Sequence, residues 1–265
     1  MTDPAASPFD RAEAYDRYMG RWSRLIAARF LDWLAVPSGA AWLDVGCGTG
    51  ALLGTIAATR APGRLTGIDQ SAQYAAVARQ RVPGAEVLVG DAQALPFAAD
   101  SFDACVSGLV LNFVPQPALA VAGMCHATRP GGVVGVYVWD YAEGMQLLRS
   151  FWDVVTELDP AANALDEGSK RFSIAHPEAL ESLFTTAGLG SVATTAVEVP
   201  APFASFDDYW RPFLGGQGPA GGYLVALPEE RQATVAAALR ERLPLRVDGS
   251  FDLTLRAWAV RGTVS

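Results

Sequence analysis

The sequence is poor in the residues on which nucleic-acid binding and structural metal sites depend. Lys170 is the only lysine among the 265 residues, the net charge is -8, and Lys and Arg form no cluster. Because a nucleic-acid binder needs a basic face for phosphates, a DNA or RNA partner is disfavoured. The three cysteines, Cys47, Cys105 and Cys125, have no C-x-x-C spacing. This pattern argues against a disulfide framework or structural zinc, and we expect no metal site.

Long apolar runs are also missing. No stretch approaches the roughly 18 apolar residues that a membrane span requires. The first ten residues lack the basic and apolar segments of a secretion signal. We therefore expect a cytoplasmic protein without a membrane span. Hydrophobic residues nevertheless make up 51% of the chain and charged residues only 18%, so it can bury a sizeable core.

Strand and helix patterns alternate between residues 41 and 139. The expected strands are 41–45, 64–68, 86–89, 102–107 and 132–139, and the expected helices are 50–59, 71–81 and 117–128. Such alternation predicts an α/β fold: a Rossmann-like, mostly parallel sheet with helices on both faces. Open sheets of this kind bind ligands beyond the carboxyl ends of their strands.

The remaining segments predict additions to this core. We expect an N-terminal helical lid over residues 1–36 and the Rossmann-like core over 37–200. Residues 201–247 are rich in Pro, Gly and aromatics and are interpreted as a cap insertion over the substrate. The alternating pattern in 248–265 is typical of a terminal antiparallel strand of the core.

A glycine loop follows the first expected strand. Gly46, Gly48 and Gly50 precede a helix, where glycine allows a ligand to approach the backbone and the helix start offers N–H groups. Gly46, Gly48 and Ala51 also satisfy the dinucleotide pattern G-x-G-x-x-[GA]. The loop alone therefore leaves both NAD and S-adenosylmethionine (SAM) open.

Three carboxylates at strand ends bear on that choice. Asp44 precedes the first glycine by two residues, where it suits an ammonium group and would repel a pyrophosphate. Asp69 ends the second strand and could accept ribose hydroxyls from either ligand. Asp91 ends the third strand and could accept from an adenine amino group, with the Ala92 N–H donating to the ring. Asp44 and Asp91 favour SAM.

Four segments carry a family resemblance: WLDVGCGTG, LTGIDQS, VGDAQALPFAADSFDACVS and RPGGVVGVYVW. Their order and spacing over residues 41–139 resemble the class I SAM-dependent methyltransferases. They look most like the small-molecule branch that includes the ubiquinone and menaquinone C-methyltransferases. The resemblance implies a seven-stranded sheet with an antiparallel last strand, SAM as methyl donor and S-adenosylhomocysteine as product.

The resemblance also implies roles for individual residues. Asp44 would face the SAM amino group directly or through water, Asp69 would bind the ribose hydroxyls, and Asp91 the adenine. The other implied SAM contacts are Gly46, Cys47, Gly48, Gly50, Gln70, Ala92, Gln93, Leu109 and Asn112. Cys47 would contribute mainly backbone, although a reactive thiol is the alternative.

The segment YDRYMGRW resembles the entry to the family's lid. Tyr18 or Trp22 could close over the sulfonium, because an aromatic face attracts a desolvated cation. Arg21 could bind the SAM carboxylate through two hydrogen bonds. The alternative is a surface helix whose aromatic residues dock on the core.

Catalytic groups are less evident. Methyl transfer gains most from orientation and a dry site, and needs a base only if the acceptor must first lose a proton. Asp140 and Tyr141 follow the fifth strand and could orient or deprotonate an acceptor. Aromatic residues after residue 138 suit a small apolar or aromatic acceptor: Trp139, Tyr141, Phe172, Phe203, Phe206, Tyr209, Trp210 and Phe213. O-, N- and C-methylation and the oligomeric state stay open.

Two other functions have to be compared with the sequence. A short-chain NAD-dependent dehydrogenase needs a Tyr-x-x-x-Lys pair, but Asp166 stands where that tyrosine should precede Lys170. A non-catalytic SAM sensor would keep the SAM-contact residues and need no catalytic group. The sequence thus predicts a SAM-dependent methyltransferase for a small acceptor, with the sensor as the alternative.

Overall fold

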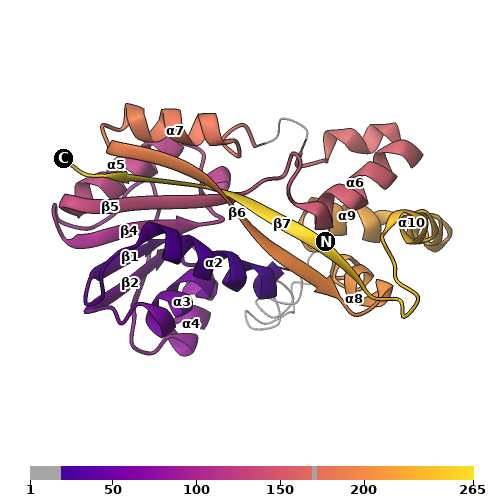
Figure 1. The fold of residues 1–265 in the computed structure, drawn as a ribbon, viewed down its shortest axis with the longest axis horizontal. Helices are drawn as coiled ribbons and strands as arrows, with labels where there is room; N and C mark the ends of the chain where they lie inside the picture. The colour runs from indigo at the N-terminus through magenta and orange to yellow at the C-terminus, as the bar shows by residue number, and fades with distance from the viewer. Residues whose placement is uncertain (1–18, 169–171) are drawn as a thin grey trace. The chain divides into compact units, whose positions relative to one another are not determined.

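A seven-stranded sheet organises the fold (Figure 1). The structure, a computed structural model, describes residues 19–168 and 172–265. The strand order is β3-β2-β1-β4-β5-β7-β6. The strands are β1 (Ala41–Val45), β2 (Arg64–Asp69), β3 (Glu86–Val89), β4 (Phe102–Gly108), β5 (Thr128–Trp139), β6 (Gly190–Phe203) and β7 (Phe251–Thr263). Strands β1 to β5 pair in parallel, whereas β7 is antiparallel to β5. The predicted Rossmann-like fold and its antiparallel last strand are confirmed.

Helices cover both faces of this sheet, as parallel strands joined by crossovers require. Helices α2 (Arg21–Leu34), α3 (Ala51–Thr59) and α4 (Ala72–Arg81) lie on one side, and α5 (Pro117–Ala127) and α7 (Pro177–Thr186) on the other (Figure 1). Helix α2 comes very close to β5. A Cβ on Gly135 would lie 2.7 Å from Leu34 Cδ2, so glycine at this position lets the helix pack directly on the strand.

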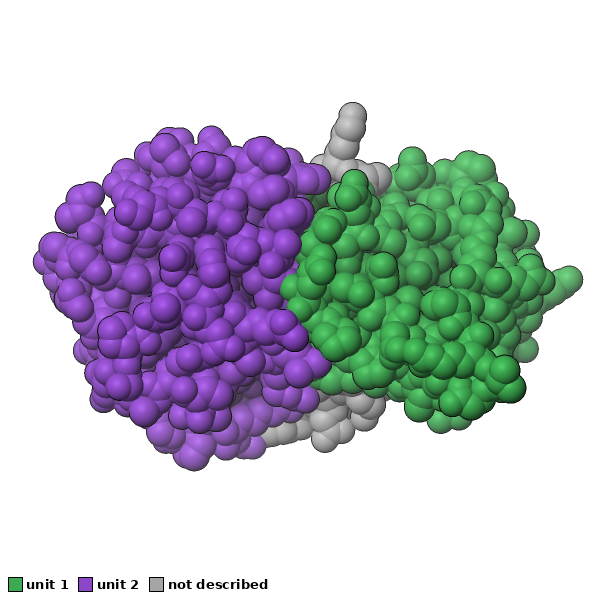
Figure 2. Space-filling view, in the orientation of Figure 1, with its two compact units in different colours: residues 1–22, 140–172, 198–256 green, residues 23–139, 173–197, 257–265 purple. Residues whose placement is uncertain are grey.

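The chain divides into two compact units (Figure 2). One, here called the core unit, contains residues 23–139, 173–197 and 257–265. The other, the cap unit, contains residues 1–22, 140–172 and 198–256. The predicted domain division assigned residues 140–172 to the Rossmann-like core. In the structure, this segment groups with residues 198–256.

Helix α6 (Gln146–Leu158) explains that grouping. Its apolar side is buried, and Phe151 stacks on Phe213 with 4.8 Å between ring centroids. The other helices of the cap unit are α8 (Phe206–Trp210), α9 (Gly218–Ala226), α10 (Glu229–Arg242) and the short 3-10 helices η3 (Pro160–Ala164) and η4 (Phe213–Gly215).

Aromatic residues form the interior of the cap unit. Phe203 stacks on Phe251 at 5.0 Å, and Tyr209 donates a hydrogen bond to the Leu147 carbonyl. Phe203, Phe206, Tyr209 and Phe213, expected as available for an acceptor, are all buried. Their large apolar area therefore stabilises this unit. None of the helices in the described ranges has the length and apolarity to cross a membrane.

Candidate cofactor-binding site

The glycine loop joins β1 to α3 through backbone conformations with positive φ. Gly46 and Gly50 have φ values of 76° and 91°, which side-chain-bearing residues rarely adopt. A Cβ on Gly46 would also lie 2.5 Å from Val110 Cγ1, on the segment after β4. Glycine at position 46 thus lets two strand ends approach each other.

Asp69 holds this loop in place from the neighbouring strand. Its Oδ2 accepts from the Gly48 N–H at 2.8 Å, and its Oδ1 accepts from the Ser71 N–H at 2.8 Å. The Gly46 and Cys47 N–H groups donate to the Ile68 carbonyl at 2.7 and 3.0 Å. Since each carboxylate oxygen can accept twice, Asp69 keeps capacity for two ribose hydroxyls. Its role in holding the loop was not foreseen from the sequence.

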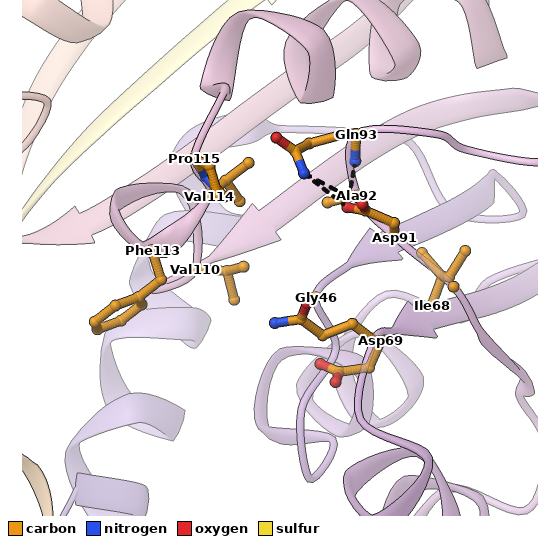
Figure 3. Close-up of a pocket in the computed structure, with 12 residues that line it drawn as sticks. Gly46, Ile68, Asp69, Asp91, Ala92, Gln93, Val110, Phe113, Val114 and Pro115 are labelled. Carbon is orange, nitrogen blue, oxygen red and sulfur yellow. Dashed lines mark hydrogen bonds between the residues drawn. The ribbon is translucent and has the colours of Figure 1, made fainter.

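A pocket opens where β1, β2, β3 and β4 end (Figure 3). Its lining residues are Gly46, Ile68, Asp69, Gln70, Gly90, Asp91, Ala92, Gln93, Val110, Phe113, Val114 and Pro115. Six of these were predicted SAM contacts: Gly46, Asp69, Gln70, Asp91, Ala92 and Gln93. The predicted residues are thereby brought together on one side of the pocket.

The opposite side of the pocket is apolar and was missed by the sequence reasoning. Val110, Phe113, Val114 and Pro115 follow β4 and pass through the 3-10 helix η2 (Leu111–Phe113). Val110, Val114 and Pro115 lie across the pocket from Asp69 and Asp91, whereas the Phe113 ring points away from these acids (Figure 3). A flat, mostly apolar ring with polar edges fits between such walls.

Asp44 is the most unusual polar group of the core unit. Its side chain is buried, the residue being 1% exposed, and neither carboxylate oxygen is paired with a cation or a side-chain donor. The Leu53 backbone N–H favours the charged form, but its effect is the smallest of those acting on this group. Burial, with the negative charge of Asp69 as a smaller cause, raises the pKa of Asp44 from its ordinary 3.8 to about 8. A buried carboxylate without a cationic partner is costly. It fits an ammonium group, or a water bound to one, as its missing partner.

Cys47 lies beside these acids and is also buried. Burial, reinforced by the charges of Asp44 and Asp69, raises the pKa of its thiol well above the usual range. Because the reactive species is the thiolate, the arrangement argues against the reactive-thiol alternative.

Six other predicted contacts in the core unit do not line the pocket: Asp44, Cys47, Gly48, Gly50, Leu109 and Asn112. Leu109 has φ +62°, a strained value for a bulky residue, and its N–H donates to the Tyr137 carbonyl at 2.8 Å. Both polar atoms of the Asn112 amide are buried without a partner. Backbone strain and unpaired polar atoms thus occur just after β4, at two of the predicted SAM contacts.

The predicted lid residues belong to the cap unit. Arg21 donates from Nη1 to both oxygens of Asp208, at 3.1 and 3.3 Å, and lies over the Trp22 ring at 4.1 Å. Trp22 is buried and contacts Phe203. The packing fits the docked-aromatic alternative, and Asp208 already offsets the Arg21 charge. No sequence pattern signals a partner so far along the chain. Tyr18 lies outside the described residues.

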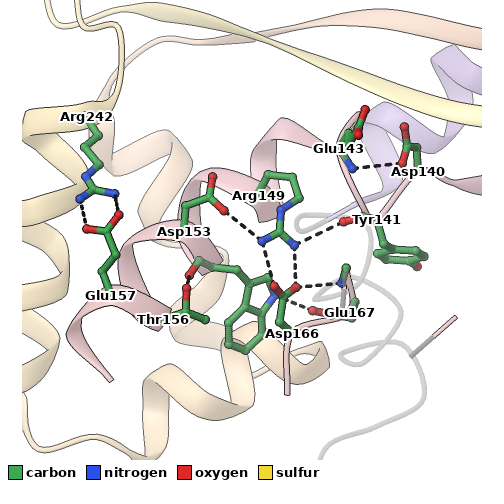
Figure 4. Close-up of polar contacts among 12 residues, drawn as sticks. Asp140, Tyr141, Glu143, Arg149, Asp153, Thr156, Glu157, Asp166, Glu167 and Arg242 are labelled. Carbon is green, nitrogen blue, oxygen red and sulfur yellow. Dashed lines mark hydrogen bonds and ion pairs between the residues drawn. The ribbon is translucent and has the colours of Figure 1, made fainter. Parts of the chain in front are cut away.

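Asp140 has a full set of partners. Its Oδ2 accepts from Arg256 Nε at 2.7 Å and Nη2 at 2.6 Å. Its Oδ1 accepts from the Glu143 N–H at 3.1 Å (Figure 4). Both oxygens of this carboxylate are thus committed to groups of the protein itself, and one of those groups carries a positive charge. The geometry therefore favours a structural role for Asp140 over proton transfer.

Tyr141, the second candidate for catalysis, is also buried. Its ring packs against Phe172 at 4.9 Å, and its carbonyl accepts from Arg149 Nη1 at 3.4 Å (Figure 4). Its role toward an acceptor stays a prediction. Over the residues that the structure describes, no group of three or more His, Cys, Asp or Glu is placed to hold a metal ion.

The sheet order and the glycine loop after β1 define the fold class. A seven-stranded sheet in the order 3-2-1-4-5-7-6 with β7 antiparallel is the Rossmann-like fold of class I methyltransferases. Over its whole length, the chain superposes on the [4+2]-cyclase SpnF, with a TM-score of 0.53, 20% identity and 85% of that chain covered. This likeness shows the fold alone.

Sequence comparison then gives the family. The methyltransferase domain family matches residues 43–136, so this part of the chain is a class I SAM-dependent methyltransferase domain.

Two relatives indicate the range of the family. The chain is 41% identical over 106 residues, 38% of its length, to the 2-phytyl-1,4-naphtoquinone methyltransferase of Thermosynechococcus vestitus, covering 47% of it. It is 35% identical over 131 residues, 49% of its length, to the malonyl-[acyl-carrier protein] O-methyltransferase of Pectobacterium atrosepticum, covering 50% of it. The chain therefore spans about half the length of each of these curated relatives.

Proposed function

We propose that this protein transfers the methyl group of SAM to a small, apolar or aromatic acceptor and releases S-adenosylhomocysteine. The observation that carries the proposal is the buried carboxylate of Asp44, which lacks a cationic partner, behind a glycine loop. A dinucleotide would bring a pyrophosphate to this loop, and a second negative charge would add to the cost of burying Asp44. An amino acid ammonium would instead relieve it.

The acids at the strand ends each have a place in this proposal, Asp44 beneath the glycine loop and Asp69 and Asp91 in the pocket lining. Asp44 would hold the ammonium of SAM, Asp69 its ribose hydroxyls and Asp91 its adenine amino group. Val110 and Val114 would pack on the faces of the purine. When bound, SAM supplies an electrophilic methyl group on a sulfonium. The protein would therefore contribute mainly by orienting that methyl group toward the acceptor and by excluding water.

The acceptor class rests on charge and on the relatives. A net charge of -8 disfavours polyanionic acceptors such as nucleic acids. One relative named above acts on a naphthoquinone and the other on a malonyl group carried by a protein. We favour the first kind, because a net charge of -8 disfavours an acceptor that carries its own negative charge. A phenol or hydroquinone would have to lose its proton to solvent or to a base other than Asp140.

A screen with methyl-labelled SAM tests this proposal. The purified chain would be incubated with panels of phenols, hydroquinones, carboxylic acids, thioesters and amines, and labelled products identified by mass spectrometry. We expect label in a phenol or hydroquinone product and none with the amines. A matched Asp44→Asn variant should lose most of the turnover, because its amide cannot offset the ammonium charge.

A second candidate is a SAM-binding protein that does not transfer methyl groups. The observation in its favour is that Asp140 is held by Arg256 and is not available as a base. This candidate predicts saturable SAM binding and no labelled product with any member of the panel.

A further inference from the structure

The Gln93 side chain joins two walls of the pocket that come from different strands. Its amide Nε2 donates to both carboxylate oxygens of Asp91, at 3.2 Å each. Its amide Oε1 accepts from the backbone N–H of Gln116 at 3.0 Å. Figure 3 shows the side chain of Gln93 extending from Asp91 toward the wall formed by Val114 and Pro115.

The contact with Asp91 restricts how that carboxylate can turn. Asp91 Oδ1 accepts from the Gln93 N–H at 2.9 Å as well as from Nε2, whereas Oδ2 accepts from Nε2 alone. Since a carboxylate oxygen can accept twice, Oδ2 keeps the greater capacity to accept from a ligand. Three donated bonds thus fix Asp91 as an acceptor that presents Oδ2.

The contact with Gln116 fixes the opposite wall. Gln116 is the N-cap of α5, which begins with Pro117, and the segment before it lines the pocket. The Gln93 oxygen therefore holds the end of the Phe113–Pro115 segment at a set distance from Asp91. The amide of Gln93 donates to Asp91 through its nitrogen and accepts from Gln116 through its oxygen, so one side chain serves both walls.

We propose that Gln93 is a positioning residue that sets the selectivity of the pocket for a 6-aminopurine. The inference rests on the proposed function, in which Asp91 accepts from the adenine amino group of SAM. Gln93 acts through Asp91: it holds the carboxylate where an exocyclic amino group meets Oδ2. A 6-oxopurine presents a carbonyl oxygen at that point, and two acceptors facing each other repel.

The test measures base selectivity. The dissociation constants of S-adenosylhomocysteine and S-inosylhomocysteine, which differ at the purine 6-position, would be measured by calorimetry for each variant. The unmodified protein should prefer the adenosyl compound by about tenfold or more, the usual weight of one hydrogen bond to a charged group. Gln93→Met, which keeps the length but neither donates nor accepts strongly, should lower that ratio at least threefold.

Two further variants serve as controls for the effect of Gln93→Met on base selectivity. Gln80→Met, at an exposed position of α4, should keep the unmodified ratio. Gln93→Asn keeps an amide but is one methylene shorter, so it cannot reach both partners and should also lower the ratio. It replaces Gln93→Met if thermal melting shows that the latter does not fold.

The outcomes separate the two claims. If the unmodified protein binds neither compound, the proposed function fails. If it binds and discriminates, but Gln93→Met weakens both compounds equally or neither, the ratio is unchanged and the positioning role is overturned. A ratio that falls in the Gln93 variants and not in Gln80→Met supports it.

Discussion

At the scale of single residues, buried charge decides most of what the structure implies. Asp44 and Asp140 are both acids at strand ends, and both are almost fully buried. Asp140 is matched by Arg256, whereas Asp44 has no cationic partner among the described residues. A buried acid that the fold leaves without a cation points to a ligand, and a buried acid paired with a cation points to stability.

The first prediction concerns the pH dependence of stability. Burial raises the pKa of Asp44 to about 8, so the folded protein keeps a proton that the unfolded chain releases above its ordinary pKa of 3.8. The stabilising contribution of this proton is full below that value and is lost as the pH rises toward 8. Within this window the slope from Asp44 is about 1.4 kcal/mol per pH unit.

Denaturant unfolding between pH 5 and pH 8 measures this slope. Asp44→Asn has no proton to lose, so its stability should fall less steeply with pH than that of the unmodified protein. Groups common to both proteins cancel in the difference. Identical slopes would mean that Asp44 is ionised in the folded state.

The second prediction separates structure from catalysis at Asp140. Asp140→Asn should lower the free energy of unfolding by about 1–3 kcal/mol, because it removes a charged partner of Arg256. The loss is limited because Glu143 and Glu198 also lie near Arg256, at 3.5 and 3.6 Å. Turnover per folded molecule should change less than threefold. A loss of turnover beyond a hundredfold, with stability intact, would instead make Asp140 a base.

At the scale of elements, the glycine loop is where local conformation and ligand binding meet. Gly46 has positive φ and a close neighbour in Val110, whereas Gly48 has φ 52° and open space around its missing Cβ. Alanine at position 48 would introduce backbone strain only. Alanine at position 46 would introduce the same strain and a steric clash with Val110, so the two variants distinguish the two effects.

The third prediction follows from this difference. Gly48→Ala should cost about 1–2 kcal/mol of stability through strain alone. Gly46→Ala should cost about 3 kcal/mol or more and weaken SAM binding over tenfold, because Val110 must move out of the pocket wall. Thermal melting and calorimetry measure both effects. Equal costs for the two variants would show that the Val110 contact relaxes freely.

Elements were predicted well where periodicity is strong. The predicted helices 71–81 and 117–128 lie within one residue of the bounds of α4 and α5, and the five strands from β1 to β5 fall where apolar runs occur. Helices α8 and α9 were not foreseen. Helix α8 has only five residues, and α9 contains three glycines and a proline, so neither shows a helical repeat of its own. Packing within the cap unit sustains them.

At the scale of the whole molecule, the carboxyl ends of the parallel strands could be anticipated as the site, but its second wall could not. Asp69 and Asp91 are recognisable because each is an acid directly after an apolar run. Val114 and Pro115 resemble any loop residues in the sequence, and only the fold brings them opposite the acids. Likewise, the Arg21 partner Asp208 lies 187 positions away, beyond any local pattern.

The two units also differ in what the sequence could reveal about them. The core unit follows the general rules of parallel sheets, so its strand order agrees with the expectation for the family. The cap unit is held by aromatic packing and by ion pairs such as Arg149 with Asp166 at 2.6 Å. No local sequence pattern indicates such contacts. Acceptor specificity is the least predictable property for the same reason, because it depends on residues that only the fold brings together.

The measurement that tests the central claim most directly is proton release on SAM binding. Because the pKa of Asp44 is about 8, the free protein holds this proton at pH 7, and an ammonium beside Asp44 should expel it. Calorimetry in buffers of different ionisation enthalpy should show close to one proton released by the unmodified protein and none by Asp44→Asn. Saturable binding of NAD in place of SAM, or SAM binding without proton release, would contradict the account.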